Sequence, residues 1–233
     1  KAELEVKLGT FGTLNATTTP ANQQVYWRSS NEAVASVTPS GVVAPYHAGT
    51  TTITAWFTDS DGVDHEATCD VTIYLPNAVY YVQNTNSHYY LSARSAGISQ
   101  GTDVNQYFKH DTSAVTSHLL AQMWRFFYLG DGRYSIRPMH KLNMGLSAPS
   151  SDVRLTEIGT TDSLSGIATN SRWKIYYSGS GYVLQCEGST ARTLAPVSNS
   201  TSVNTYVDAH SFSETSTVQR WTLTKITSPP SGV

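Results

Sequence analysis

The chain has 233 residues, of which 14% are charged and 11% aromatic, and its formal net charge is −2. A typical domain has roughly 150 residues, so this length allows one or two domains. The near-neutral charge excludes the strongly basic surface that binds nucleic acids or anionic membranes. No apolar run approaches the roughly 18 residues that span a bilayer. Tyr, Thr and Ser are abundant relative to the usual helix formers, so we expect a globular, all-β chain with no nucleic-acid partner and no membrane insertion.

The first 75 residues follow the two-residue period of β-strands. Leu4, Val6 and Leu8 alternate with polar residues, and residues 52–57 continue the same pattern. Clusters of Pro, Gly, Asn and Asp interrupt these runs about every ten residues, which is typical of turns. Short strands with regular turn signals and no helical period predict a small β-sandwich.

Four blocks of this segment match a known family in order: residues 25–31, 34–37, 40–43 and 48–55. Together with the strand at 67–73, they resemble the group 2 bacterial immunoglobulin-like domain. The resemblance implies an immunoglobulin-like β-sandwich that serves as a spacer or adhesion module and carries no catalysis. We expect this domain to cover residues 1–75, because Pro76 ends the last strand. Residues 76–227 then form a second domain, and residues 228–233 a linker or tail of a larger parent chain.

The second segment contains one unit copied three times. Trp124, Trp173 and Trp221 recur 49 and 48 residues apart, and repeats of this kind fix the architecture of a fold. Each copy also has an aromatic first strand, a Leu eleven or twelve residues later and a second strand. The first strands begin at Tyr80, Tyr134 and Tyr182, the Leu landmarks are Leu91, Leu146 and Leu194, and the second strands cover 103–107, 152–156 and 202–206. Three four-stranded units of this kind are expected to close into a capped barrel.

The pattern resembles the ricin B-type β-trefoil lectin family over the whole second segment. Gln122-Met123-Trp124 and Gln219-Arg220-Trp221 match the family's Gln-x-Trp motif, and Ser171-Arg172-Trp173 is a degenerate copy. The resemblance implies a three-repeat β-trefoil with one shallow sugar site in each repeat. In such a site a carboxylate and amides bind sugar hydroxyls, and an aromatic ring covers the apolar face of the sugar.

The family's site positions map onto this chain one residue at a time. The carbohydrate-binding candidates are Ser92, Asn105, Tyr107 and Gln122 in the first repeat, and Asn204, Tyr206 and Gln219 in the third. The second repeat offers Ser147, Arg154 and Thr156 and therefore lacks the aromatic residue. The family's Asp after the conserved Leu is absent from all three repeats, where Ser92, Ser147 and Ala195 stand instead.

Each of these residues also has a structural interpretation. The two Asn side chains are also suited to satisfying backbone groups at strand ends, and the two Tyr rings to forming part of the barrel wall. Gln122 and Gln219 fit a structural role in the closing motif better than contact with a ligand. Four polar residues that follow the Tyr positions are candidates to replace the lost Asp, although solvated loop positions explain them better: His110, Asp111, Asp208 and His210.

Three further features are not interpreted as sites. Residues 97–101 fit the G-x-S-x-G pattern around Ser99, but a β-strand follows where a nucleophile elbow requires a helix. Residues 59–64 lack the spacing and the twelfth-position Glu of a calcium loop, and Asp61-Gly62 fits a hairpin turn. Cys69 and Cys186 fall on apolar strand faces and are predicted to be buried and unbridged. We expect no catalytic residues, no metal site and no cofactor.

The sequence predicts a non-catalytic, lectin-like fragment of a larger bacterial surface or secreted protein, used for adhesion or for targeting an enzyme to glycans. Glycans are the expected partners, with galactose-type sugars among them, and the fragment is expected to be a monomer within a multidomain chain. The alternative is a structural or protein-binding module whose trefoil has lost sugar recognition. A hydrolase is disfavoured because no convergent acid–base pair is present in the sequence.

Overall fold

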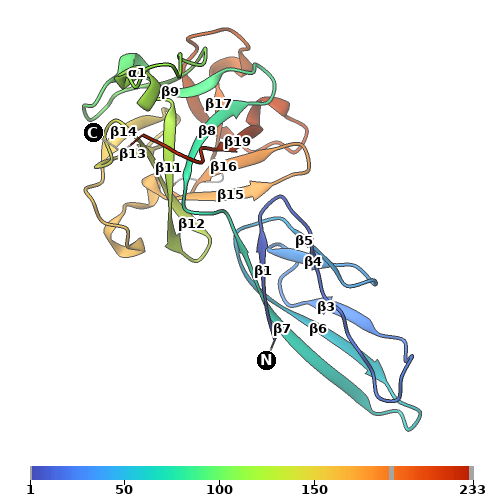
Figure 1. Cartoon of the computed structure of the whole chain (residues 1–233). Coiled ribbons are helices and arrows are strands. Elements are labelled where there is room, and N and C mark those ends of the chain that lie inside the picture. The colour runs from blue at the N-terminus through green and yellow to red at the C-terminus, as the bar shows by residue number, and fades with distance from the viewer. Residues whose placement is uncertain (1, 189–191, 231–233) are drawn as a thin grey trace. The chain divides into compact units, whose positions relative to one another are not determined.

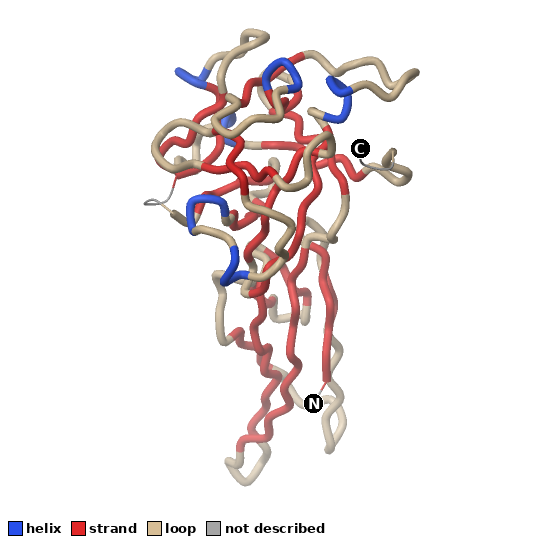
Figure 2. The backbone as a smooth tube through the Cα atoms, turned by 90° about the vertical axis from the view of Figure 1, so that its left-hand side faces the viewer, coloured by secondary structure: helices blue, strands red, loops and turns tan. Residues whose placement is uncertain are grey.

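The computed structural model describes residues 2–188 and 192–230, and the chain folds into two compact units, Lys1–Leu75 and Pro76–Val233 (Figure 1). Strands dominate both units and helices are short (Figure 2), as the composition predicted. The boundary lies between Leu75 and Pro76. Of the predicted tail at 228–233, residues 231–233 lie outside the described residues. The described part of the chain contains no helix long and apolar enough to cross a membrane.

The first unit is an immunoglobulin-like sandwich of two sheets. One sheet has the order β1-β7-β6-β3, with β1 parallel to β7, and the other has the order β2-β5-β4. The strands are β1 (Ala2–Lys7), β2 (Gly12–Thr13), β3 (Tyr26–Ser29), β4 (Ala35–Val37), β5 (Val42–Pro45), β6 (Gly49–Thr58) and β7 (Asp64–Tyr74).

The core of the first unit follows the predicted alternation. Val6, Val43, Ile53 and Val71 are buried and come from both sheets, so each strand contributes one apolar face to the interior. Cys69 is buried with them, as predicted.

The turn between β6 and β7 is the predicted Asp-Gly hairpin. The Asp59 carboxylate accepts the backbone N–H groups of Asp61 and Val63 at 2.9 Å each, and Gly62 has a positive φ of 80°. The hydrogen bond from His65 lowers the pKa of Asp59, so this carboxylate is ionised and bound within the turn.

The second unit contains three four-stranded repeats. The first comprises β8 (Val79–Asn84), β9 (Tyr90–Ala93), β10 (Val104–Tyr107) and β11 (Met123–Gly130). The second comprises β12 (Arg133–Pro138), β13 (Met144–Ser147), β14 (Arg154–Glu157) and β15 (Trp173–Tyr177). The third comprises β16 (Tyr182–Cys186), β17 (Arg192–Pro196), β18 (Val207–Ser211) and β19 (Trp221–Lys225). The helical pieces are α1 (Ser117–Leu120), η1 (Arg94–Ala96), η2 (Leu164–Gly166), η3 (Thr169–Ser171), η4 (Val197–Asn199) and η5 (Thr217–Gln219).

The first and last strands of the repeats form a closed barrel. The pairs run β8-β11, β11-β12, β12-β15, β15-β16 and β16-β19, and β19 returns to β8. The middle strands form three antiparallel hairpins, β9-β10, β13-β14 and β17-β18. Closure leaves the barrel with no free edge, and the hairpins are the predicted cap.

The three tryptophans occupy equivalent places in this barrel. All three are fully buried, and each stands opposite the Tyr that opens its repeat in the strand register. Their indole N–H groups donate to the carbonyl oxygens of Leu91, Leu146 and Leu194 at 2.9, 2.8 and 2.9 Å. The same hydrogen bond, made three times, ties each closing strand to the hairpin of its own repeat. This confirms the predicted three-copy fold.

One predicted element is wrong. The third repeat's second strand was expected at 202–206, but it begins at Val207. Gln106 of β10 donates its side-chain N–H groups to the carbonyls of Ser200 and Ser202 at 3.0 and 2.7 Å. The segment from 200 to 206 therefore lies against the first repeat, and β17 pairs instead with the residues that follow.

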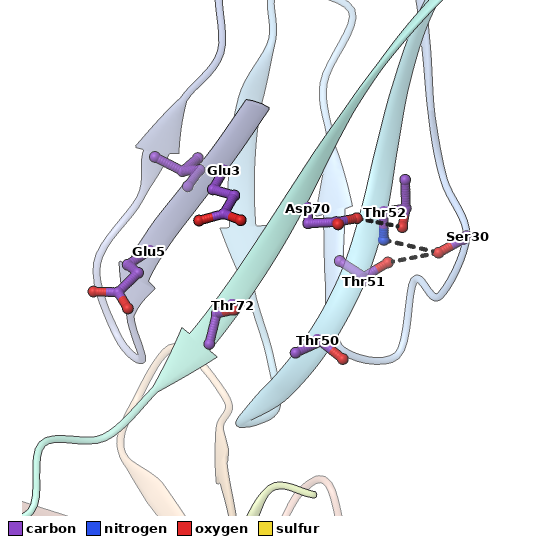
Figure 3. Close-up of a pocket in the computed structure, with 9 residues that line it drawn as sticks. Glu3, Glu5, Ser30, Thr50, Thr51, Thr52, Asp70 and Thr72 are labelled. Atoms are coloured by element: carbon purple, nitrogen blue, oxygen red, sulfur yellow. Dashed lines mark hydrogen bonds between the residues drawn. The ribbon is translucent and has the colours of Figure 1, made fainter. Parts of the chain in front are cut away.

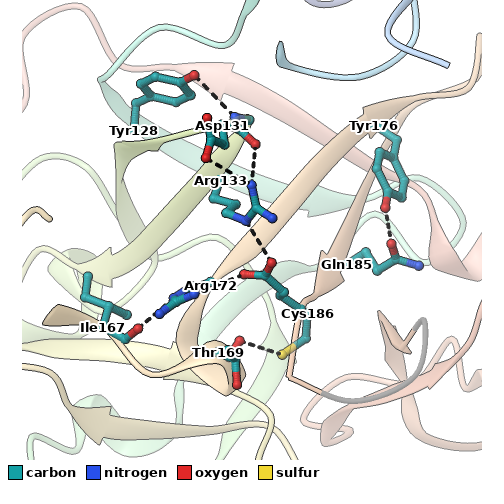
Figure 4. Close-up of polar contacts among 11 residues, drawn as sticks. Tyr128, Asp131, Arg133, Ile167, Thr169, Arg172, Tyr176, Gln185 and Cys186 are labelled. Atoms are coloured by element: carbon teal, nitrogen blue, oxygen red, sulfur yellow. Dashed lines mark hydrogen bonds and ion pairs between the residues drawn. The ribbon is translucent and has the colours of Figure 1, made fainter. Parts of the chain in front are cut away.

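A partly buried ionic network joins the second and third repeats (Figure 4). Glu187, which follows β16, pairs with Arg133 at 2.7 Å and with Arg172 at 3.6 Å. Arg172 also donates to the carbonyl of Ile167 at 2.7 Å. The neighbouring Cys186 is buried and free, as predicted, and burial raises the pKa of its thiol, so it is a packing residue rather than a nucleophile.

Candidate functional site

The hairpin registers define three equivalent site positions. Ser92 stands opposite Asn105 in the first repeat, Ser147 opposite Arg154 in the second, and Ala195 opposite Asp208 in the third. In the first and second repeats these are the predicted pairs.

In the third repeat the predicted second-strand residues are displaced. Asn204 lies in a turn with a φ of +60°, and Tyr206 precedes β18. The equivalents of Asn105 and Tyr107 are Asp208 and His210, which sequence analysis had considered only as substitutes for the lost Asp. The spacing of the first repeat would have located them, because Asn105 follows Ser92 by 13 residues and Asp208 follows Ala195 by 13, whereas the second repeat has a shorter hairpin.

Each site position is completed by the neighbouring repeat. Three antiparallel bridges each join the segment just before the second strand of one repeat to the site position of another repeat. The bridges are Tyr206 with Asn105, Asp103 with Arg154, and Asp152 with Asp208. The three bridges follow the pseudo-three-fold symmetry. The loop of one repeat is therefore a wall of the next repeat's site.

The largest share of the predicted residues meets in one pocket between the first and third repeats. This hollow has a volume of about 350 Å³ and is lined by Ser92, Arg94, Ser95, Asn105, Tyr107, His110, His118 and Asn204. Four of the seven predicted residues are in that lining, and one of them, Asn204, comes from the third repeat. A single pocket thus replaces the two separate sites that the sequence predicted.

A pair of amides forms the polar centre of the pocket. The Asn105 side-chain N–H donates to Asn204 Oδ1 at 2.6 Å, and the backbone N–H of Asn204 donates to the carbonyl of Gln106 at 2.8 Å. Asn105 is only 3% exposed, and its Oδ1 accepts no hydrogen bond from any described residue. A buried acceptor without a donor costs roughly 1–3 kcal/mol.

Aromatic rings form one side of the pocket. Tyr107 and His110 lie nearly parallel, with centroids 5.4 Å apart and an interplanar angle of 22°, and His118 contacts His110 edge-on at 5.4 Å. Burial, with a smaller contribution from His118, lowers the pKa of His110. His110 is therefore neutral near pH 7 and presents one donor and one acceptor.

Arg94 forms the opposite polar side. Its guanidinium lies 4.7 Å from the centroid of the Tyr206 ring and donates a hydrogen bond to the Tyr206 hydroxyl. Tyr206 is therefore not a sugar platform of the third repeat. It positions the arginine of the first repeat.

The two glutamines of the closing motifs have structural roles. Gln122 donates to the carbonyl of Phe108 at 2.6 Å and accepts from the backbone N–H of His110 at 2.8 Å. Gln219 makes the same pair with Ser211 and Ser213 at 2.6 and 2.8 Å. Both side chains are nearly inaccessible, at 0% and 4% exposure. Burial keeps both amides away from a ligand, so the structural interpretation of these two candidates is the better one.

The other two repeats offer weaker sites. Arg154 is engaged by Asp152 at 3.0 Å and by Asp103 at 3.5 Å. In the third repeat, burial and then repulsion by Asp152 raise the pKa of Asp208, and Ala195 supplies no polar group. Ion pairs within the protein thus occupy the second-repeat position, and the third-repeat position brings two carboxylates close together.

A larger hollow of about 600 Å³ lies on the first unit (Figure 3). It is an open sheet surface whose polar groups already bind one another. Thr52 donates its hydroxyl to Asp70 at 2.9 Å and its backbone N–H to Ser30 at 2.9 Å. The hollow contains no aromatic ring, so it lacks the feature that covers the apolar face of a sugar.

The sequence features that were not interpreted as sites have no catalytic or metal-binding geometry in the described part of the chain. Ser99 lies in an exposed loop between η1 and β10, with no helix after it. Among residues 2–188 and 192–230, no group of three or more His, Cys, Asp or Glu side chains is placed to hold a metal ion.

A closed six-stranded barrel capped by three hairpins is a β-trefoil, and the first unit is an immunoglobulin-like sandwich. The family model described as "Bacterial Ig-like domain (group 2)" matches residues 1–69. No curated protein sequence matches the chain significantly.

Several solved structures are similar to this chain. The designed three-fold symmetric protein ThreeFoil is 24% identical, with a TM-score of 0.52, over 64% of this chain and 99% of that chain. The Rhizoctonia solani agglutinin is 18% identical, with a TM-score of 0.52, over 66% of this chain and 99% of that chain. An exo-β-1,3-galactanase from Clostridium thermocellum is 15% identical, with a TM-score of 0.52, over 87% of this chain and 42% of that chain. At these identities the likeness establishes the all-β fold alone.

Proposed function

We propose that this chain is a non-catalytic, carbohydrate-binding fragment of a larger protein, and that the pocket between the first and third repeats is its sugar site. The observation that carries the proposal is the amide pair in that pocket: the Asn105 side-chain N–H donates to Asn204 Oδ1, and both side chains line the hollow together with Tyr107. Amides that bind hydroxyls next to an aromatic face are the chemistry of a shallow sugar site.

The proposal extends to the organisation of the chain. Residues 1–75 form a spacer or adhesion domain, residues 76–227 the lectin-like domain, and residues 228–233 a linker. The parent protein is secreted by, or displayed on, a bacterium and uses the fragment for adhesion or to direct an enzyme to glycans. The likeness to an agglutinin and to a galactanase supports these two uses.

The test is a glycan array followed by calorimetric titration of the whole chain. Tyr107→Ala removes the aromatic face, and Asn204→Gly removes one amide while keeping a residue that tolerates the positive φ. Asn22→Gly is the matched control, since Asn22 also has a positive φ, of 64°, but lies in the first unit. We expect both site variants to lose about tenfold or more in affinity, as for loss of one well-placed hydrogen bond, and the control to bind normally. Absence of binding to every glycan, or unchanged binding by both site variants, would contradict the proposal.

A protein-binding role is the alternative, and it is favoured by the absence of the family's Asp at Ser92, Ser147 and Ala195. A partner captured from surface extracts that free sugars do not displace, and that Tyr107→Ala still binds, would support this second function.

A further inference from the structure

The lining of the pocket holds one positive charge and no negative one. It contains Arg94 and the two histidines His110 and His118, but neither Asp nor Glu. The carboxylate that lies nearest to these residues in the sequence, Asp111, is bound by the hydroxyl of Ser113 at 2.6 Å and by its backbone N–H at 2.9 Å. It is therefore engaged in its own turn. The chemistry of this lining differs from the carboxylate-anchored site that the family resemblance implies.

Arg94 is held in place but is not neutralised. Among the described residues, it has no carboxylate partner, whereas Arg28, Arg133, Arg137, Arg154 and Arg172 each have one. Its hydrogen bond to Tyr206 uses one N–H of a guanidinium that has five. The Tyr206 ring also fixes its plane. A positioned guanidinium with free N–H groups is suited to binding a carboxylate or sulfate through two parallel hydrogen bonds.

The equivalent places in the other repeats have lost this feature. In the third repeat, η4 repeats the backbone conformation of η1, with φ values of 53° and 56° at Ser198 and Asn199, but Val197 stands where Arg94 stands in the first. In the second repeat Pro149 stands at that place, and Arg154, which is equivalent to Asn105, is compensated by two aspartates. Of the three equivalent places, only the one in the pocket with the amide pair therefore carries an uncompensated positive charge.

We infer that the sugar bound in this pocket carries an anionic group, and that Arg94 binds that group while Asn105 and Asn204 bind hydroxyls and Tyr107 covers the ring. This inference rests on the proposed function and names its ligand class: a sugar with a carboxylate, such as a uronic acid, or with a sulfate ester. Tyr206 is a positioning residue for Arg94.

Matched sugar pairs test this directly. We would titrate the whole chain with galacturonic acid and galactose, with glucuronic acid and glucose, and with galactose 6-sulfate. We expect at least one acidic sugar to bind about tenfold or more tightly than its neutral partner at low salt, and the ratio to fall between about 0.02 and 0.3 M salt because free ions screen the charge. Comparison of the uronic acids with the sulfate identifies which anionic group is preferred.

Three variants assign the effect to Arg94. Arg94→Gln should reduce the acidic-to-neutral ratio to about one while neutral-sugar binding persists, and Arg94→Lys should retain part of the ratio, because it keeps the charge but loses the two-pronged geometry. Lys225→Gln removes one exposed positive charge elsewhere on the second unit and should keep the full ratio. Circular dichroism of each variant establishes that it is folded.

The outcomes separate the two proposals. Equal or tighter binding of the neutral sugars, or an acidic preference that survives Arg94→Gln, overturns the inference and leaves the sugar site in place. Absence of binding to neutral and acidic sugars alike, on the array and in titration, overturns the proposed function itself.

Discussion

The structural role of Gln122 leads to a quantitative prediction. Gln122→Ala removes two hydrogen bonds, to the carbonyl of Phe108 and from the backbone N–H of His110. Both backbone groups then lose their partner in the interior, because the Gln122 side chain that binds them is fully buried. At about 1–2 kcal/mol for each group, the free energy of unfolding of the second unit should fall by roughly 2–4 kcal/mol. Gln219→Ala removes the same pair of bonds and should cost the same to within about 1 kcal/mol.

Urea unfolding followed by tryptophan fluorescence measures this loss, because Trp124, Trp173 and Trp221 are all buried in the second unit. Gln83→Ala is the control: its side chain makes one solvent-exposed hydrogen bond, to the carbonyl of His88 at 2.8 Å, and should cost less than about 1 kcal/mol. The reasoning is refuted if Gln122→Ala keeps full stability and abolishes sugar binding, because the amide would then act on the ligand.

Three further outcomes are expected. His140 is buried with Nδ1 unpartnered, and burial lowers its pKa. The stability that His140 provides is therefore complete above the unfolded pKa of about 6.5 and is lost as the pH falls through the lowered value. Between about pH 7.5 and 5, the free energy of unfolding should fall less in His140→Gln than in the unchanged chain. Gly41→Ala should destabilise the first unit by more than about 2 kcal/mol, because its Cβ would lie 2.2 Å from a backbone oxygen. Gly62 has the same positive φ but open space around it, so Gly62→Ala should cost only about 1 kcal/mol. Thermal melting of the two variants measures both losses. Trp173→Phe leaves the Leu146 carbonyl without its donor and should lower unfolding free energy by roughly 2–4 kcal/mol in urea titration; an unchanged midpoint would contradict its role.

The repeat landmarks were predictable because each depends on local pattern. A Trp that alternates with apolar residues and a Leu at fixed distance define a buried strand pair, and the structure places all three copies alike. The same holds for Ser92, Asn105 and Tyr107, which lie on one hairpin whose register follows from its own sequence.

The second strand of the third repeat could not be predicted from local pattern. Val203 and Tyr206 imitate the Val104 and Tyr107 pattern, but Gln106, nearly 100 residues earlier in the chain, holds this segment by its backbone. Contacts of such separation leave no periodic trace in the sequence. The composite nature of the pocket and the partnership of Arg94 with Tyr206 were missed for the same reason.

The three bridges between adjacent repeats have a consequence for how this protein can evolve. Because the loop before β18 supplies Asn204 and Tyr206 to the first repeat's pocket, a mutation inherited in one copy changes the ligand preference of another. Duplicated repeats are usually free to diverge one at a time, but here each copy diverges together with a neighbour. A single repeat excised and transplanted into another protein would therefore lose the part of its pocket that the neighbour supplies, whereas a circular permutation that preserves every neighbour would retain it.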